Sequence, residues 1–150
     1  MSPQLASSAN AIADGMRAAY DRLSAELYDA ARAAGLDRSD GEARLARFRR
    51  LASALLLDER DTLFPLLDHC GADRELLERD HRQLHDALDR AEAALARASL
   101  SDFSDVVQEL MVILRAHCIR QARLFLGCVP ELLDTVGPAP LDRVRQLFGL

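Results

Sequence analysis

The sequence predicts an all-α protein: an antiparallel up-down four-helix bundle followed by a short C-terminal helix. Apolar residues recur at spacings of three and four along almost the whole 150-residue chain, which is the periodicity of amphipathic helices. Four such segments are joined by short breaks, and long helices joined by short loops pack as antiparallel neighbours. The chain has only seven glycines and five prolines, fewer turn residues than an all-β fold needs.

The first two helices are delimited by recognisable end signals. Gly35 follows the first apolar segment and is typical of a helix C-terminus. Ser39 and Glu42 have the spacing of a capping box at the start of the second helix. Pro65 is expected to bend or end that helix, because proline lacks an amide hydrogen and clashes with the preceding turn. The four helices are predicted over residues 8–34, 39–71, 73–98 and 101–134.

The end of the chain is predicted to fold as a separate short element. Gly127 and Pro130 should disturb the last turns of the fourth helix. Residues 137–140, Gly-Pro-Ala-Pro, then break the chain, and the amphipathic stretch after them is expected to pack on the outside of the bundle. The predicted division is a four-helix bundle over 1–136 and a breaker with a short helix over 137–150.

Composition excludes several classes of protein. The net charge of −5 argues against a nucleic-acid or anionic-membrane surface as the main function. No apolar run approaches the roughly 20 residues that span a bilayer, and no signal peptide is recognisable at the N-terminus. The three cysteines, Cys70, Cys118 and Cys128, form no CxxC pair. We therefore expect reduced thiols in a cytoplasmic protein rather than a disulfide framework.

A few polar residues lie on the apolar stripes of the predicted helices. His81 and His85 are four residues apart and share one helix face, a spacing that can chelate one metal ion. In an antiparallel bundle, residues equally distant from a shared turn lie at the same height. This rule places six stripe positions in one layer near the middle of the bundle: Tyr20, Leu55, Glu59, His81, His85 and His117.

Other interpretations of these residues stay open. A single histidine on an apolar stripe is most often a core residue with a satisfied hydrogen bond, and an arginine could balance Glu59. Gln121, on the stripe of the fourth helix, could be a buried amide bonded across the bundle. A ferritin-like di-iron site would need two ExxH motifs, but only Glu78–His81 has that spacing. No nucleotide-binding or hydrolase motif is present.

Over about residues 16–133, the chain resembles the hemerythrin-like (HHE cation-binding) family, and the layer corresponds to the metal site of that family. Members of that family hold a non-haem di-iron centre that binds dioxygen or responds to oxygen, nitric oxide or peroxide. The residues that match the family's ligands are His81 and His85 on the third helix, His117 on the fourth and Glu59 on the second, followed by the family's Leu63-Phe64-Pro65 segment.

Three positions differ from the family pattern. Tyr20 and Leu55 stand where the first and second helices carry histidines, and Gln121 stands where the second bridging carboxylate belongs. The resemblance therefore implies that the ligands of one iron are lost, while three histidines and one carboxylate remain for the other.

We interpret the sequence as that of a non-haem metal-binding protein that holds one iron ion. Zinc, or a di-iron centre, is the alternative. Its ligands would be Glu59, His81, His85 and His117, with Tyr20 and Gln121 in supporting or weakly ligating positions. Its partner would be a small diatomic or oxidant molecule, sensed or detoxified rather than transported. The alternative is a bundle that has lost its metal and acts as a regulatory or protein-interaction module, with a homodimer or protein partner left open.

Overall fold

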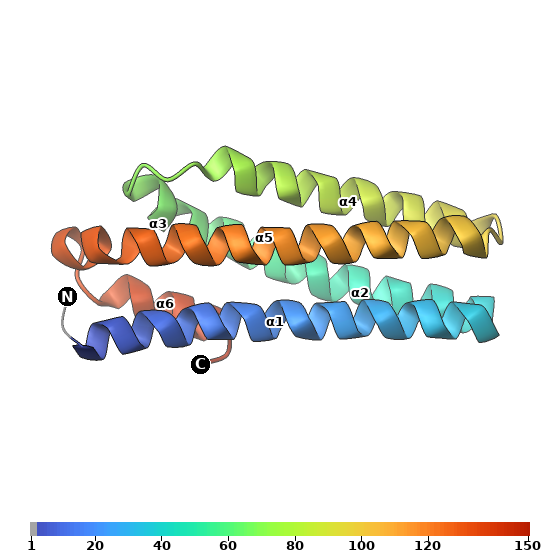
Figure 1. Cartoon of the computed structure of the whole chain (residues 1–150), viewed down its shortest axis with the longest axis horizontal. Coiled ribbons are helices and arrows are strands. Elements are labelled where there is room, and N and C mark those ends of the chain that lie inside the picture. The colour runs from blue at the N-terminus through green and yellow to red at the C-terminus, as the bar shows by residue number, and fades with distance from the viewer. Residues whose placement is uncertain (1–2) are drawn as a thin grey trace.

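The computed structural model describes residues 3–150 and is an antiparallel bundle of four long helical segments, which confirms the predicted all-α class (Figure 1). The helix α1 packs against α2 and α5, and α4 packs against α5 and α2, so that the four segments enclose one core. The elements are α1 (Pro3–Leu36), α2 (Arg38–Asp58), η1 (Glu59–Leu63), α3 (Phe64–His69), α4 (Arg74–Ala96), α5 (Leu100–Thr135) and α6 (Ala139–Leu147).

The turn between α1 and α2 is capped differently from the prediction. The side chain of Asp37 accepts hydrogen bonds from the backbone amides of Ser39 and Asp40, at 2.8 and 3.3 Å. The capping box predicted for Ser39 and Glu42 is therefore wrong. Asp37 takes the capping role because α2 begins at Arg38, one residue before the expected cap.

A wide helical turn, η1, separates α2 from α3 and lies directly before Pro65. In η1 the backbone amide of Phe64 bonds the carbonyl of Glu59, five residues back, instead of four. The wider turn accommodates the proline, whose ring would clash with the carbonyl four residues earlier in a regular helix. Pro65 thus bends the predicted second helix without ending it, and α3 continues to His69.

The end of the chain folds back onto the bundle. The helix α5 continues through Gly127 and Pro130 to Thr135, so neither residue interrupts it. After the break at Gly137, α6 packs against α1 and η1. Its residues Leu141 and Val144 are buried and join the apolar cluster at this end of the bundle.

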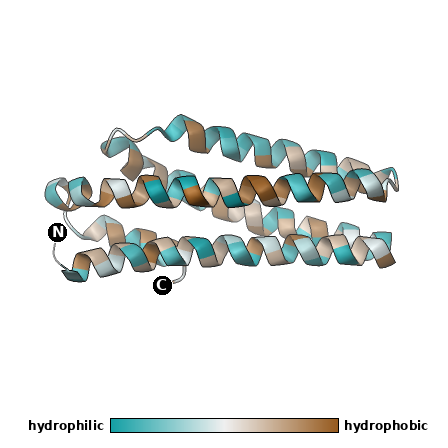
Figure 2. Cartoon of the chain, in the orientation of Figure 1, coloured by the Kyte–Doolittle hydropathy of each residue, from teal (hydrophilic) through white to brown (hydrophobic). Residues whose placement is uncertain are grey.

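The core consists of two apolar clusters with a polar layer between them. One cluster fills the end of the bundle that contains the α1–α2 and α4–α5 turns, and the other fills the end near the chain termini. The helices are correspondingly amphipathic, with apolar and polar residues mixed along each (Figure 2). Between the clusters lie the buried polar residues Glu59, Asp80, His117 and Gln121. Among residues 3–150, no helix is both long enough and apolar enough to cross a membrane.

Two of the cysteines form a disulfide, contrary to the sequence expectation of three reduced thiols. Cys70 at the end of α3 is bonded to Cys128 in α5, with their Cα atoms 5.7 Å apart. Cys118 is free and buried. The number and spacing of the cysteines did not predict this pair. The pairing depends on the later turns of α5 lying against the end of α3, which the sequence pattern does not show.

Candidate metal centre

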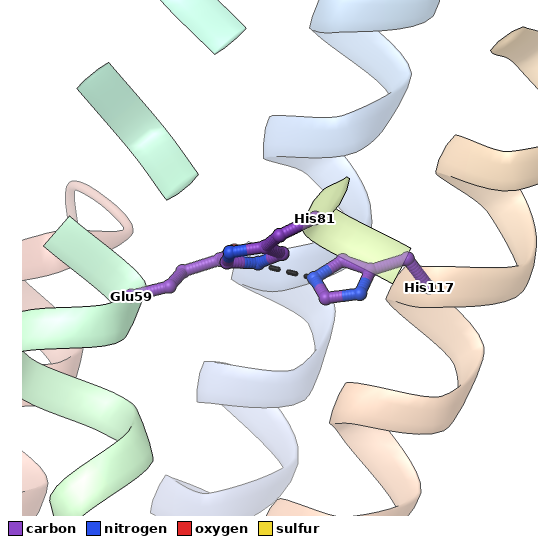
Figure 3. A group of neighbouring side chains, drawn as sticks. All are labelled: Glu59, His81 and His117. Carbon is purple, nitrogen blue, oxygen red and sulfur yellow. Dashed lines mark hydrogen bonds and ion pairs between the residues drawn. The ribbon is translucent and has the colours of Figure 1, made fainter. Parts of the chain in front are cut away.

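Three side chains from three helical segments converge in the polar layer. Glu59 begins η1, His81 lies on α4 and His117 lies on α5, and their side chains point toward one another (Figure 3). The Oε2 atom of Glu59 lies 3.2 Å from the Nε2 atoms of both His81 and His117. One ligand atom from each residue lies within 4.8 Å of the others. Two imidazole nitrogens and one carboxylate oxygen gathered this closely are a donor set that could hold a metal ion.

The wide turn of η1 helps to build this position. Leu63 and Phe64 are both completely buried, although adjacent residues of a regular helix point about 100° apart. Both belong to the apolar cluster near the chain termini. The ring of Phe64 also lies against His81, with 5.0 Å between the ring centres. The turn therefore contributes Glu59 to the polar layer and buries its next two large apolar side chains beside that layer.

Glu59 is ionised despite its complete burial. Burial alone would raise the pKa of its carboxyl group, but hydrogen bonds with His117 and His81 outweigh this and lower the pKa to about 2. For His117, burial disfavours the charged ring, but hydrogen bonds to Asp80 and Glu59 raise its pKa above the ordinary value. For His81, burial outweighs the bond to Glu59 and lowers its pKa. Below pH 6.5, the layer of the metal-free molecule thus contains an ionised Glu59 paired with a protonated His117.

Asp80 is a residue of this site that sequence reasoning missed. It is 3% exposed, and its Oδ2 atom lies 3.2 Å from Nδ1 of His117. Arg120 binds both carboxylate oxygens, with distances of 2.9 and 2.6 Å. Because the Nδ1–H of His117 donates to Asp80, the Nε2 atom is the one directed at Glu59 and available to a metal. Its distance from the turn could have identified it, because Asp80 and His117 are equally far from the turn between α4 and α5 and therefore lie in the same layer.

Tyr20 and Gln121, predicted to support the site, lie in the same layer. The hydroxyl of Tyr20 donates to Glu59, 2.8 Å from Oε1 and 3.0 Å from Oε2. Burial, followed by the charge of Glu59, raises the pKa of Tyr20 well above its ordinary value, so it remains a phenol. The amide of Gln121 lies close enough to Glu59 to contribute to lowering the pKa of its carboxyl group. However, both polar atoms of its buried side chain lack a hydrogen-bond partner within the part of the chain that the structure describes.

The structure places the other two predicted layer positions outside this group. His85 is half-buried and lines a surface pocket beside His81, but it contributes no atom to the cluster of three ligands. Four helical residues span about 6 Å along α4, which carries His85 beyond the layer. Its role as a ligand stays a prediction. Leu55 packs against both apolar clusters.

Comparison with known proteins places the chain in a family. The model of the hemerythrin HHE cation-binding domain matches residues 11–127, a range that includes all the residues of the polar layer. Searches of curated proteins and of solved structures gave no match. The match spans most of the chain, and the chain belongs to the hemerythrin HHE cation-binding domain family.

Proposed function

We propose that this protein binds one iron ion through Glu59, His81 and His117. The observation that carries the proposal is the convergence of these three ligand atoms within 4.8 Å. Beside them lies the amide of Gln121, which has no hydrogen-bond partner among residues 3–150. A buried amide without partners is costly, so its presence favours a ligand or a water molecule at this point. Imidazole nitrogens and one carboxylate oxygen are a donor set that suits iron(II), with zinc as the alternative.

The arrangement of Tyr20 supports one ion rather than two. Oε2 of Glu59 faces the two histidines, and the hydroxyl of Tyr20 lies 2.8 Å from Oε1 and 3.0 Å from Oε2. The oxygen that a second ion would share is therefore already bonded to a phenol. Leu55, which stands where the resemblance expects a histidine, offers no ligand atom.

The role we propose is sensing or detoxification of a small oxidant or gas, rather than transport of dioxygen. A bound iron would supply a Lewis-acidic, redox-active centre for such a molecule. The residues of the chain would hold that centre: Asp80 and Arg120 orient His117, and the two apolar clusters exclude water. Gln121 would be available to hydrogen-bond a bound water or ligand.

We also propose a cytoplasmic location and leave a homodimer open, as the sequence suggested. The disulfide between Cys70 and Cys128 is a counter-argument to the location, because such bonds are uncommon in reducing compartments. Trapping thiols in intact cells with an alkylating reagent, before lysis, would give the redox state of the pair where the protein resides.

The alternative function, a bundle that has lost its metal and mediates protein interactions, is less well supported. It requires Glu59 to be balanced by an arginine or water, with the imidazoles directed apart. Within residues 3–150, the side chains hydrogen-bonded to Glu59 are Tyr20, His81 and His117, and no arginine is paired with it.

Metal content of the tag-free protein, measured by elemental mass spectrometry, tests the proposal. The variants are His81→Ala, His117→Ala and His85→Ala. The matched control is His69→Ala, because His69 lies at the end of α3 and bonds Thr135 at 2.9 Å, away from the site. We expect about one iron per chain, lost in the first two variants and retained in the control.

The remaining outcomes are equally informative. Loss of metal in His85→Ala would add His85 to the ligands. Two ions per chain would contradict a site for one ion. No metal, even after anaerobic reconstitution with iron(II), would overturn the proposal and favour the interaction module.

A further inference from the structure

A pocket of about 440 Å³ lies between α2 and α4, on the surface of the bundle next to His81. We propose that it binds a small organic anion: a carboxylate, or a similar monoanion, carrying an apolar body. Apolar side chains and cationic groups line it together, namely Leu56, Leu57 and Phe64 with Arg60 and Arg82. The imidazole of His85 also borders it.

The charges of the pocket favour an anion. Arg82 has no ion-pair partner among the residues that the structure describes. Within the described part of the chain, the ion-pair partner of Arg60 is its neighbour Asp61, at 3.4 Å, and both side chains are more than half exposed. The one carboxylate in the lining, Glu78, is already bonded to Arg74 at 2.6 Å. The pocket is therefore locally cationic on a chain whose net charge is −5.

The size and the walls of the pocket favour an organic molecule over a bare inorganic anion. Pockets of organic ligands typically measure about 300–1,000 Å³ and combine apolar walls with a few polar groups. The volume of about 440 Å³ lies within that range. Leu56 and Phe64 are buried side chains at the inner wall, whereas Arg60 and Arg82 are exposed at the surface. An apolar body would contact the inner wall while its charged group meets the guanidinium groups.

The pocket adjoins the candidate metal centre through one residue. His81 lines the pocket and is 12% exposed, whereas the side chains of Glu59 and His117 are completely buried. A molecule bound in this pocket would therefore lie beside one of the three candidate ligands. The anion-binding groups, Arg60 and Arg82, are not among the metal ligands, so the inference does not require the proposed metal.

The test is a titration of isotopically labelled full-length protein with benzoate, followed by amide chemical shifts in NMR spectra. Two further probes separate the contributions: benzyl alcohol has the apolar ring without the charge, and inorganic phosphate has charge without the ring. Each is added to metal-free and to zinc-treated protein. The variant is Arg82→Gln, and the control is Arg143→Gln, which makes the same charge change at an exposed position of α6.

We expect benzoate to shift amides of α2 and α4 that border the pocket, in metal-free protein as well. Arg82→Gln should weaken this binding roughly tenfold, since it removes a charge-assisted hydrogen bond, while Arg143→Gln leaves it within twofold. The proposal is overturned if benzyl alcohol or phosphate binds as tightly as benzoate, if both variants weaken binding equally, or if no amide near the pocket shifts. Benzoate binding is judged in the metal-free protein, so a failure to bind benzoate can be distinguished from a failure to bind iron.

Discussion

At the scale of single residues, Glu59 determines what the polar layer can do. A completely buried carboxylate is stable only when donors or a cation replace the water it has lost. Tyr20, His81 and His117 supply those donors from α1, α4 and α5. A metal ion at this point would displace the histidine hydrogen bonds but would leave that of Tyr20. Tyr20 would therefore stabilise Glu59 with and without a metal ion. The two histidines would be hydrogen-bond donors to Glu59 without the ion and ligands in its presence.

The first prediction concerns the hydroxyl of Tyr20. Tyr20→Phe should lower the free energy of unfolding of the metal-free protein by about 1–3 kcal/mol, because it removes a donor from a buried carboxylate. Urea unfolding measures this. Tyr28→Phe is the matched control, since Tyr28 is on the same helix but is 56% exposed, and it should change stability by less than about 0.5 kcal/mol. Equal effects of the two variants would contradict the hydrogen bond to Glu59.

The second prediction concerns the orientation of His117 by Asp80. Asp80→Asn should weaken metal binding by about 10- to 100-fold, the usual effect of losing a carboxylate behind a ligating histidine. Arg120→Gln, which leaves that carboxylate but removes the group that holds it, should weaken binding in the same direction and by less. Competition with a chromophoric chelator measures the affinity. Arg123→Gln provides the control, because Arg123 is exposed on the same helix and makes none of the contacts with Asp80.

A spectrum separates orientation from general destabilisation. The cobalt(II)-substituted protein should show an altered ligand-field spectrum in Asp80→Asn, while circular dichroism remains that of the wild type. An unchanged spectrum together with unchanged affinity would show that Asp80 and Arg120 form only a structural ion pair.

The individual site residues were predictable to different degrees. The placement of Glu59, His81 and His117 in one layer follows from helical spacing and distance to the turns, and the structure brings these three together. His85 shares the helix face of His81, and spacing alone does not tell which of two histidines one turn apart meets the carboxylate. Asp80 was missed because it is adjacent to His81 and lies off the apolar stripe. Its burial arises from the α4–α5 contact, which the apolar pattern of one helix does not describe.

At the scale of elements, the close approach of α1 and α2 depends on one glycine. A Cβ atom at Gly41 would lie 2.5 Å from Cβ of Ala34 and 2.6 Å from its Cα. The backbone of α1 cannot yield as a flexible side chain could. Small residues on both sides therefore allow the two helices to meet directly after the turn at Asp37.

The third prediction follows from this contact. Gly41→Ala should destabilise the protein by about 1–3 kcal/mol, because overpacking outweighs the better helix propensity of alanine. Gly35→Ala is the matched control, because Gly35 is also helical and its added Cβ would meet no atom of the described chain within 4 Å apart from its chain neighbours and the backbone of its own helix. Its stability should rise by about 0.5–1 kcal/mol. Thermal unfolding compares the two. Stabilisation by both substitutions would contradict the close packing.

The helices themselves were largely predictable, whereas their ends and irregularities were not. Four apolar periodicities suffice to place four helices, since an amphipathic stripe has to be buried against its neighbours. The cap at Asp37 depends on which of several polar residues adopts an extended backbone, and this is decided at the turn itself. The wide turn of η1 could not be located from Pro65 alone, because a proline can kink, end or be accommodated within a helix.

At the scale of the whole molecule, the disulfide closes a long loop. Cys70 and Cys128 are 58 residues apart, and the loop between them contains all of α4 and most of α5. The bond thus connects the end of the second helical segment to the fourth. It holds together the apolar cluster on one side of the polar layer.

The fourth prediction tests this bond. Cys70→Ser should lower the free energy of unfolding by about 2–5 kcal/mol, since a cross-link over a long loop restricts the unfolded chain. Unfolded wild-type protein should present one thiol to Ellman's reagent before reduction and three after it. Cys118→Ser, which removes the free buried cysteine, leaves the cross-link in place and is the control. Three thiols before reduction would show that the pair is not bonded.

The last prediction concerns the pH dependence of the metal-free protein, in which Glu59 and His117 form one ion pair. The pKa of Glu59 is lowered to about 2, so its contribution to stability is present above the ordinary value of 4.5 and is lost as the pH falls toward 2. The pKa of His117 is raised, so the same contribution is present below 6.5 and is lost as the pH rises through the raised value. The pair should therefore stabilise most between about pH 4.5 and 6.5.

Urea unfolding of wild type and Glu59→Gln, with a chelator present, measures this contribution across the pH range. The difference in unfolding free energy between the two proteins should be largest within that window and should shrink on both sides. Glu75→Gln, at an exposed position of α4, should show no such maximum. A difference that does not vary with pH would mean that Glu59 and His117 do not carry opposite charges in the folded, metal-free protein. The cluster would then be a neutral hydrogen-bonded core, which binds a cation far less readily than an ionised carboxylate does.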